Sequence, residues 1–129
     1  MRITTHTAID QTLCGTPTCV EPHRSTVTMR CASSMAADEH GLVHGGFVFG
    51  LADYAAMLAV NHPNVVLGGA EVRFTKPVRV GDELVASAYD TSPDERKHRV
   101  QVDVLLGETV VFSGVFTCFI LPKHVLSQD

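Results

Sequence analysis

The chain has 129 residues, which is enough for one ordinary domain and too few for two hydrophobic cores of normal size. Hydrophobic residues make up 45% and charged residues 19%, the composition of a globular domain whose surface can be partly buried between subunits. A formal net charge of −4 with scattered basic residues argues against a nucleic-acid partner. Residues 1–7 contain no signal-peptide core, and no apolar run approaches the length of a membrane span, so we expect a cytoplasmic protein with no membrane partner.

Four cysteines are spread irregularly, at positions 14, 19, 31 and 118. In a reducing compartment this number and spacing favour free thiols over a disulfide framework. No second pair of Cys or His residues matches the spacing of Cys14 and Cys19, so we expect no metal site. The one basic cluster, residues 95–99, is interpreted as a solvated hairpin turn, with a modest role in holding a substrate's phosphates as the alternative.

The first 23 residues are polar and are interrupted by one glycine and two prolines. This punctuation predicts an irregular N-terminal segment over residues 1–23, with at most one short helix around 8–13. Residues 24–31 alternate between apolar and polar side chains, which predicts a half-buried strand. Small and acidic residues over 33–43 predict a loop.

Residues 45–60 form a long run rich in Ala, Leu and Met, followed by Asn, His and Pro. A run of this kind predicts a helix of about four turns. The helix is apolar on every side, so we expect it to be buried all round, by a curved sheet on one side and a partner on the other. Four further strands separated by turn signals are predicted at 65–74, 82–90, 98–106 and 109–121. Short turns between consecutive strands favour antiparallel pairing, and the whole chain is predicted to be one α+β domain.

The start of the predicted helix carries the candidate chemistry. Gly45 and Gly46 expose backbone N–H groups where the helix dipole is positive, which suits an oxyanion, although such a pair alone is also consistent with a tight structural turn. Asp53 is the only carboxylate in the helix. Burial among apolar neighbours raises the pKa of a carboxylate, as in functional acids and bases. The alternative is that Asp53 points to solvent or caps a neighbouring turn.

Gly45 and Asp53 are eight residues apart, which corresponds to about 12 Å along a helix axis. One thioester carbonyl cannot contact both groups within one chain. If two copies of the helix lie antiparallel across a two-fold axis, however, Gly45 of one subunit meets Asp53 of the other. The site is therefore predicted to require a dimer. His44 is given a role in orienting the carbonyl or the loop, while a role as general base stays open.

The segment Gly41-Leu-Val-His-Gly-Gly-Phe-Val-Phe-Gly-Leu-Ala-Asp53 resembles the HGG-x₆-D signature of hotdog-fold thioesterases of the PaaI-like type. The stretch Phe74-Thr-Lys-Pro-Val-Arg-Val-Gly-Asp-Glu-Leu84 is similar to the strand, proline and Gly-Asp hairpin that follow the helix in that family. As an order of elements, the resemblance covers about residues 24–121.

This resemblance implies an antiparallel five- or six-stranded sheet wrapped around one long central helix, in homodimers that often pair into homotetramers. It also implies hydrolysis of an acyl-CoA substrate without a metal or cofactor. By position, the Gly45 amide polarises the thioester carbonyl, Asp53 of the facing subunit is general base or nucleophile, and His44 helps to orient the carbonyl. The residues predicted to contact the substrate are Gly46, Tyr54, Met57, Gly68 and Gly69.

Two features depart from the family pattern. Asp38 stands where a polar Asn commonly precedes the HGG, and an acid there is expected either to pair or to repel a carboxylate substrate. Residues 67–69 offer no hydroxyl where many relatives place Ser or Thr, which weakens the case for an aryl-acyl substrate.

Two other functions fit the same fold. One is a non-catalytic acyl-CoA binding or sensor protein, and the other is a hotdog enoyl-thioester hydratase or dehydratase. The retained Asp53 favours an enzyme, and no helix-turn-helix or basic segment indicates a DNA-binding regulator. The identity of the acyl chain does not follow from the sequence.

Overall fold

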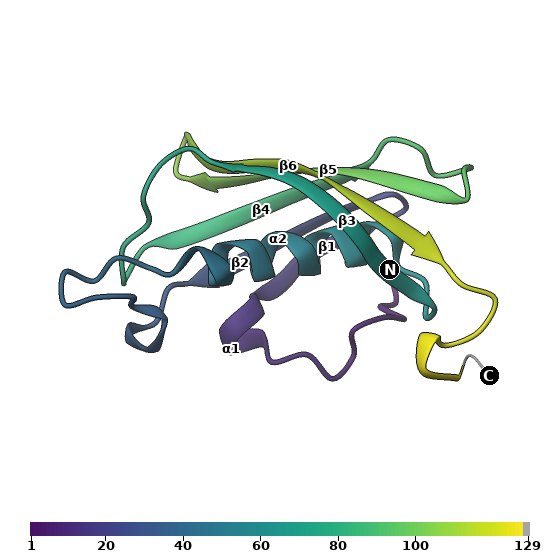
Figure 1. Ribbon diagram of the computed structural model, residues 1–129, viewed down its shortest axis with the longest axis horizontal. Helices are drawn as coiled ribbons and strands as arrows, with labels where there is room; N and C mark the ends of the chain where they lie inside the picture. Colours follow the sequence, from purple (N-terminus) through teal and green to yellow (C-terminus); the bar gives the residue numbers. More distant parts are fainter. Residues whose placement is uncertain (128–129) are drawn as a thin grey trace.

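The structure, a computed structural model, describes residues 1–127 and consists of one antiparallel sheet packed on one long helix (Figure 1). The helices, in chain order, are α1 (Gln11–Cys14), η1 (Ser33–Met35), α2 (Gly45–Val60) and η2 (Val125–Ser127). The strands are β1 (Thr16–Glu21), β2 (Arg24–Arg30), β3 (Val65–Phe74), β4 (Glu83–Asp90), β5 (Lys97–Leu106) and β6 (Thr109–Ile120). The predicted bounds of α2 and β3 are confirmed, and the other predicted strands differ by one residue at an end.

The six strands lie in the order β1-β2-β4-β5-β6-β3, and every neighbouring pair is antiparallel. The predicted pairing of consecutive strands is confirmed for the hairpins β4-β5 and β5-β6, but it is wrong for β3 and β4. β3 instead pairs with β6 at the far edge of the sheet. The reason is that the chain after β3 crosses to the start of α2, where Val43 N–H donates to Val78 O at 2.8 Å, before it returns to the sheet as β4.

α2 lies against the concave face of the sheet, which curves over it (Figure 1). Val48, Leu51, Ala55 and Leu58 recur at helical spacing and are at most 3% exposed. The helix ends at Val60, and Asn61 is its C-cap: the Asn61 N–H still donates to Met57 O, while its left-handed φ of 50° turns the chain out of the helix. The sheet therefore buries one side of this helix, as predicted, through a long apolar contact.

The prediction that residues 1–23 are irregular is wrong for residues 16–21, which form β1. Pro17 obscures this strand in the sequence because a proline cannot donate to a ladder of hydrogen bonds. β1 is an edge strand with only β2 beside it, and a bulge separates Pro17 from Cys19. An edge with a bulge is a position where a strand tolerates proline.

Residues 2–15 run along the side of α2 that is turned away from the sheet, and we call them the N-terminal strap (Figure 1). The strap includes α1, whose first turn is capped by Asp10. The expected partner on this side of α2 is therefore replaced, over part of the helix, by a segment of the same chain. Among residues 1–127 no helix is long and apolar enough to cross a membrane.

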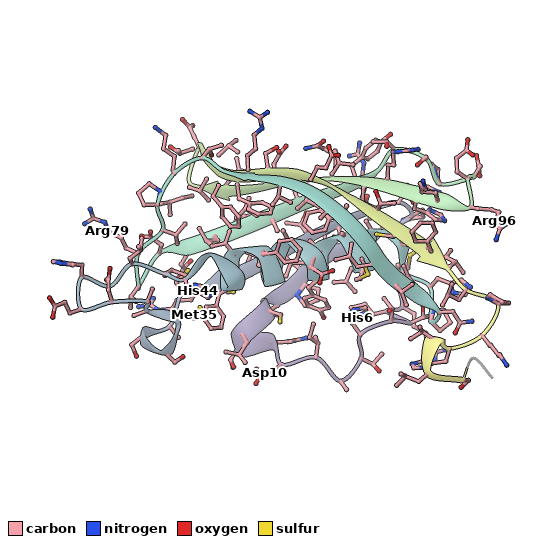
Figure 2. All side chains as sticks on the ribbon, in the orientation of Figure 1. His6, Asp10, Met35, His44, Arg79 and Arg96 are labelled. Atoms are coloured by element: carbon pink, nitrogen blue, oxygen red, sulfur yellow. The ribbon has the colours of Figure 1, made fainter. Side chains whose placement is uncertain are left out.

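The basic cluster at 95–99 is only partly a solvated turn. Glu95 and Arg96 lie in the turn between β4 and β5, whereas residues 97–99 begin β5. His98 is 6% exposed, and its Nδ1 lies 2.7 Å from Oδ2 of the buried Asp90. Figure 2 places Arg96 at the opposite end of the molecule from His44, so within one chain this cluster lies far from the start of α2.

Candidate active site

The start of α2 is fixed by the chain that leads into it. His44 is the N-cap, with extended backbone angles of −62° and 131°, and its N–H donates to Met35 O at 2.9 Å. Its side chain makes no capping hydrogen bond and is exposed. The ring instead packs edge-on against Phe47, with the centroids 6.1 Å apart. The backbone of His44 is thus fixed by a hydrogen bond, and the residue lies at the N-terminal end of α2 (Figure 2).

Two backbone donors at this helix start are unused. The first N–H groups of a helix have no acceptor within the helix, so they need a cap, water or a ligand. Over residues 1–127, the N–H groups of Gly45 and Gly46 have no hydrogen-bond acceptor, whereas Phe47 N–H donates to His44 O at 3.0 Å. Two adjacent free donors at the positive end of a helix of four turns suit an oxyanion.

Gly45 and Gly46 have no side chains, and aromatic rings of neighbouring residues lie close to both. A Cβ on Gly46 would lie 3.0 Å from Cδ2 and Nε2 of His44. A Cβ on Gly45 would lie 3.1 Å from Cε2 of Phe74. Glycine at both positions therefore keeps the N–H groups accessible and lets the two rings approach them.

A pocket of about 310 Å³ opens beside Gly45. Its lining is apolar apart from one lysine, and consists of Leu42, Val43, Gly45, Val48, Phe74, Lys76, Pro77, Val78 and Val111. The volume is at the lower end of the range of about 300–1,000 Å³ that is usual for small-molecule sites. Apart from Gly45, the sequence did not reveal these lining residues, because they converge only when β3 and its following loop cross the start of α2.

Asp53 lies two turns further along α2. Its side chain is half-buried, and Oδ1 is the one buried side-chain N or O atom among the described residues without a hydrogen-bond partner. Burial raises the pKa of the Asp53 carboxyl from 3.8 to about 6. The predicted rise in pKa is thus present, with desolvation as its cause.

One stripe of α2 between these groups remains open. Gly46 is exposed, and Phe49, Gly50 and Asp53 are half-buried, in contrast to the fully buried residues that face the sheet. A Cβ on Gly50 would meet no atom within 4 Å. The stripe joins the free donors to the carboxylate, and the rise of a helix separates the two by about 12 Å.

Tyr54 and Met57, which the sequence predicts to contact the substrate, are only 2% and 1% exposed. Tyr54 faces the strap, where its ring lies 6.3 Å from the His6 ring. Neither side chain is open to a ligand.

Gly68 and Gly69 lie on β3, away from the start of α2. Gly68 sits at a bulge, where Phe119 occupies the place that a side chain would take. Gly69 has open space around its Cα and pairs with Thr117 of β6. The structure thus brings His44, Gly45 and Gly46 together, with Asp53 two turns away, and leaves these two glycines on the edge strand.

Asp38 neither forms an ion pair within residues 1–127 nor lines the pocket beside Gly45. Its Oδ1 accepts the N–H groups of His40 at 2.9 Å and Leu42 at 3.2 Å. The carboxylate therefore stabilises the turn that precedes the helix start. No group of three or more His, Cys, Asp or Glu residues within 1–127 is arranged to hold a metal ion.

Residues 40–112, more than half of the chain, match the family described as the thioesterase superfamily. The chain therefore belongs to the thioesterase superfamily. The crystal structure of the uncharacterized protein PH1136 from Pyrococcus horikoshii is 51% identical, with a TM-score of 0.97 over 98% of both chains. A point mutant of the phenylacetic acid degradation protein PaaI from Thermus thermophilus is 26% identical, with a TM-score of 0.78 over 84% of this chain and 95% of that one. The predicted hotdog fold is confirmed, with six strands around the central helix.

Two curated relatives are longer than this chain. A methylthioribose-1-phosphate isomerase of Aquifex aeolicus is 50% identical over 122 residues, which are 94% of this chain and 27% of that protein. The transcription factor FapR of Shouchella clausii is 32% identical over 82 residues, which are 64% of this chain and 43% of that protein. The chain thus spans about a quarter of the first relative's length and less than half of the second's.

Proposed function

We propose that the protein is an acyl-CoA thioesterase that hydrolyses a thioester to a free acid and CoA at sites shared by two subunits. The observation that carries this proposal is the combination of two unused N–H donors at the start of α2 with an unpartnered carboxylate on the same open stripe. Thioester hydrolysis needs donors for the carbonyl oxygen and a base for water. Membership of the thioesterase superfamily supports the same reaction.

In the proposed reaction, the Gly45 N–H donates to the thioester carbonyl oxygen, and the adjacent Gly46 N–H and the His44 ring help to orient it. Asp53 of the facing subunit removes a proton from water as the water oxygen attacks the carbonyl carbon. The resulting oxyanion collapses, the C–S bond breaks, and Asp53 returns its proton to the departing CoA thiolate. One preorganised donor of this kind contributes about 3 kcal/mol to lowering the barrier.

The pKa of about 6 favours the general-base role for Asp53 over the role of nucleophile, since a base works best with a pKa near the operating pH. Direct attack by the carboxylate would instead form an acyl anhydride with Asp53. Repeated turnover in ¹⁸O-labelled water distinguishes the two, because only the anhydride route places the label in the Asp53 carboxyl.

A second candidate function is the binding of acyl-CoA without hydrolysis. The similarity to FapR favours it, because that relative is named as a transcription factor and shares most of this domain. A binding protein has no need of a buried carboxylate without a partner, since such a group costs stability. We therefore rank it below the enzyme. Hydration of crotonyl-CoA is the corresponding test for a hydratase.

The test of the proposed function is thiol release from short, long and aryl acyl-CoAs. We expect the wild-type protein to release CoA from at least one of them, and Asp53→Asn to be slower by a factor of about 10² or more. Asp94→Asn, in the turn between β4 and β5, is the matched control and should retain full activity. Full activity in a folded Asp53→Asn variant would remove this residue from the reaction, and tight binding without thiol release would favour the second candidate.

A further inference from the structure

The N-terminal strap is fastened at its first end to the C-cap of α2. Thr4 N–H donates to Asn61 Oδ1 at 2.9 Å, and Asn61 Nδ2 donates to Arg2 O at 2.9 Å. The Thr4 hydroxyl donates to Asn61 O at 3.0 Å. One side chain, held in the left-handed conformation by the end of the helix, thus ties two residues of the strap in place.

The middle of the strap covers the side of α2 that follows Asp53. Thr5 is 5% exposed, and Ile3 and Ile9 pack against the core. Figure 2 shows His6 and Asp10 below α2, on the side opposite the sheet. Because Tyr54 and Met57 are buried here, the surface that a ligand would meet one turn beyond Asp53 is already filled.

The last residues of the strap approach the middle of α2 very closely. A Cβ on Gly15 would lie 2.8 Å from Cδ1 of Leu51 and 2.7 Å from Cγ1 of Val27. Cys14, beside it, packs against the core and is half-buried. The strap is therefore attached at both ends, and beside it the stripe that runs from Gly46 to Asp53 stays open.

In the proposed dimer the thioester lies between Gly45 of one subunit and Asp53 of the other. The residues that follow Asp53 then lie beyond the start of the facing helix. We infer that the acyl group extends in this direction, that the strap closes it, and that the substrate is therefore limited to a short acyl group, which the pocket beside Gly45 accommodates. This inference rests on the proposed function and specifies the length of the acyl group that the enzyme accepts.

Two changes release the strap without altering the groups proposed for the reaction. Asn61→Gly suits the left-handed φ of 50° and removes the side-chain hydrogen bonds to Arg2 and Thr4. Deletion of residues 2–9 removes the covering segment itself. Asn64→Gly is the matched control, because Asn64 follows the same helix end and its side chain makes no hydrogen bond among residues 1–127.

The experiment measures the binding of S-butyl-CoA and S-dodecyl-CoA, two thioethers that cannot be hydrolysed, by calorimetry. We expect the wild-type protein and Asn64→Gly to bind the butyl compound more tightly. In Asn61→Gly and in the deletion variant, the Kd for the dodecyl compound should fall by about tenfold or more, while the Kd for the butyl compound stays within about twofold of the wild-type value. Faster labelling of Cys14, in a Cys19→Ser background, shows that the strap has been released.

Unchanged dodecyl affinity in folded variants with a released strap would overturn the inference and leave the proposed function intact. Equal affinity of the wild-type protein for the two thioethers would do the same. If the wild-type protein binds neither thioether, the inference fails, and thiol release from the acyl-CoA series decides separately whether the proposed function stands.

Discussion

The carboxyl of Asp53 is both buried and without a hydrogen-bond partner, and this combination lowers the stability of the fold. Its Oδ1 is buried without a hydrogen-bond partner, and a buried acceptor of this kind costs about 1–3 kcal/mol. Its neighbours on the same stripe, Gly50 and Phe49, have no side-chain donor. A group held in this condition is typical of a site where a ligand, water or a second chain supplies the missing partner.

The pH dependence of hydrolysis should follow the titration of Asp53. A general base must be ionised, so the rate is expected to rise with pH through about 6 and to level off above it. Measurement of kcat/KM between about pH 4 and 8 in about half-unit steps checks this for the free enzyme. The same rise in Asp53→Asn, on its low residual rate, would assign the titration to another group.

The stability of the folded protein should also respond to Asp53. Its pKa is about 6 when folded and near 3.8 when unfolded, so the folded state binds the proton more tightly. On this group alone, the free energy of unfolding falls as pH rises from about 4 to 6, and the loss persists at higher pH.

Asp53→Asn removes this penalty, so at about pH 7 it should stabilise the protein by about 1–3 kcal/mol relative to wild type. The difference should shrink toward about pH 4, as measured by urea unfolding at each pH. A variant that is less stable than the wild-type protein at neutral pH would show that the carboxylate has a favourable partner in solution.

At the scale of elements, α2 was predictable, because a long apolar run with glycines at its start and Asn-His-Pro at its end specifies a buried helix. The same glycines and Asp53 specified the candidate site. β1 was hidden by Pro17, whose compatibility with an edge depends on strand order. The strap was hidden because its anchor, Asn61, lies far away in sequence. Strand order and contacts between distant residues depend on tertiary structure, so local sequence patterns do not predict them.

The connection between the strap and β1 gives a prediction at this scale. Gly15 has a φ of 100°, and a Cβ there would also lie 2.9 Å from Thr28 O, a backbone atom that cannot move aside easily. Gly15→Ala should therefore destabilise the protein by about 2–4 kcal/mol, through backbone strain and overpacking together. Denaturant unfolding measures the loss.

Gly81→Ala provides the control for Gly15→Ala. Gly81 has a similar φ of 92°, but a Cβ there would meet nothing within 4 Å. Gly81→Ala should therefore lower the free energy of unfolding by about 1–2 kcal/mol, through backbone strain alone. Equal losses in the two variants would mean that the strap does not pack closely on α2.

At the scale of the whole molecule, one chain holds both halves of the proposed site but holds them too far apart to act together. The free N–H groups of Gly45 and Gly46 and the carboxylate of Asp53 lie about 12 Å apart along one helix. The stripe between them is bare at Gly50, which leaves space for a second helix to approach. Two antiparallel copies would bring each set of donors to the other subunit's carboxylate, forming two equivalent sites.

The two halves can be disabled separately. Gly45→Pro removes the N–H group at the first helical position, where proline is tolerated, and His44 already has the extended conformation that precedes proline. Gly45→Ala adds a Cβ beside Phe74 but keeps the N–H group, so it is the matched control. We expect Gly45→Pro and Asp53→Ala homodimers to be inactive and Gly45→Ala to retain most activity.

The most direct test of the shared site mixes Gly45→Pro and Asp53→Ala subunits and measures thiol release by purified heterodimers. Each heterodimer would contain one site with both defects and one site with neither. We therefore expect activity to return to about half of the wild-type value per dimer, as one of two equivalent sites is restored. Heterodimers as inactive as the two parent variants would contradict a site shared between subunits.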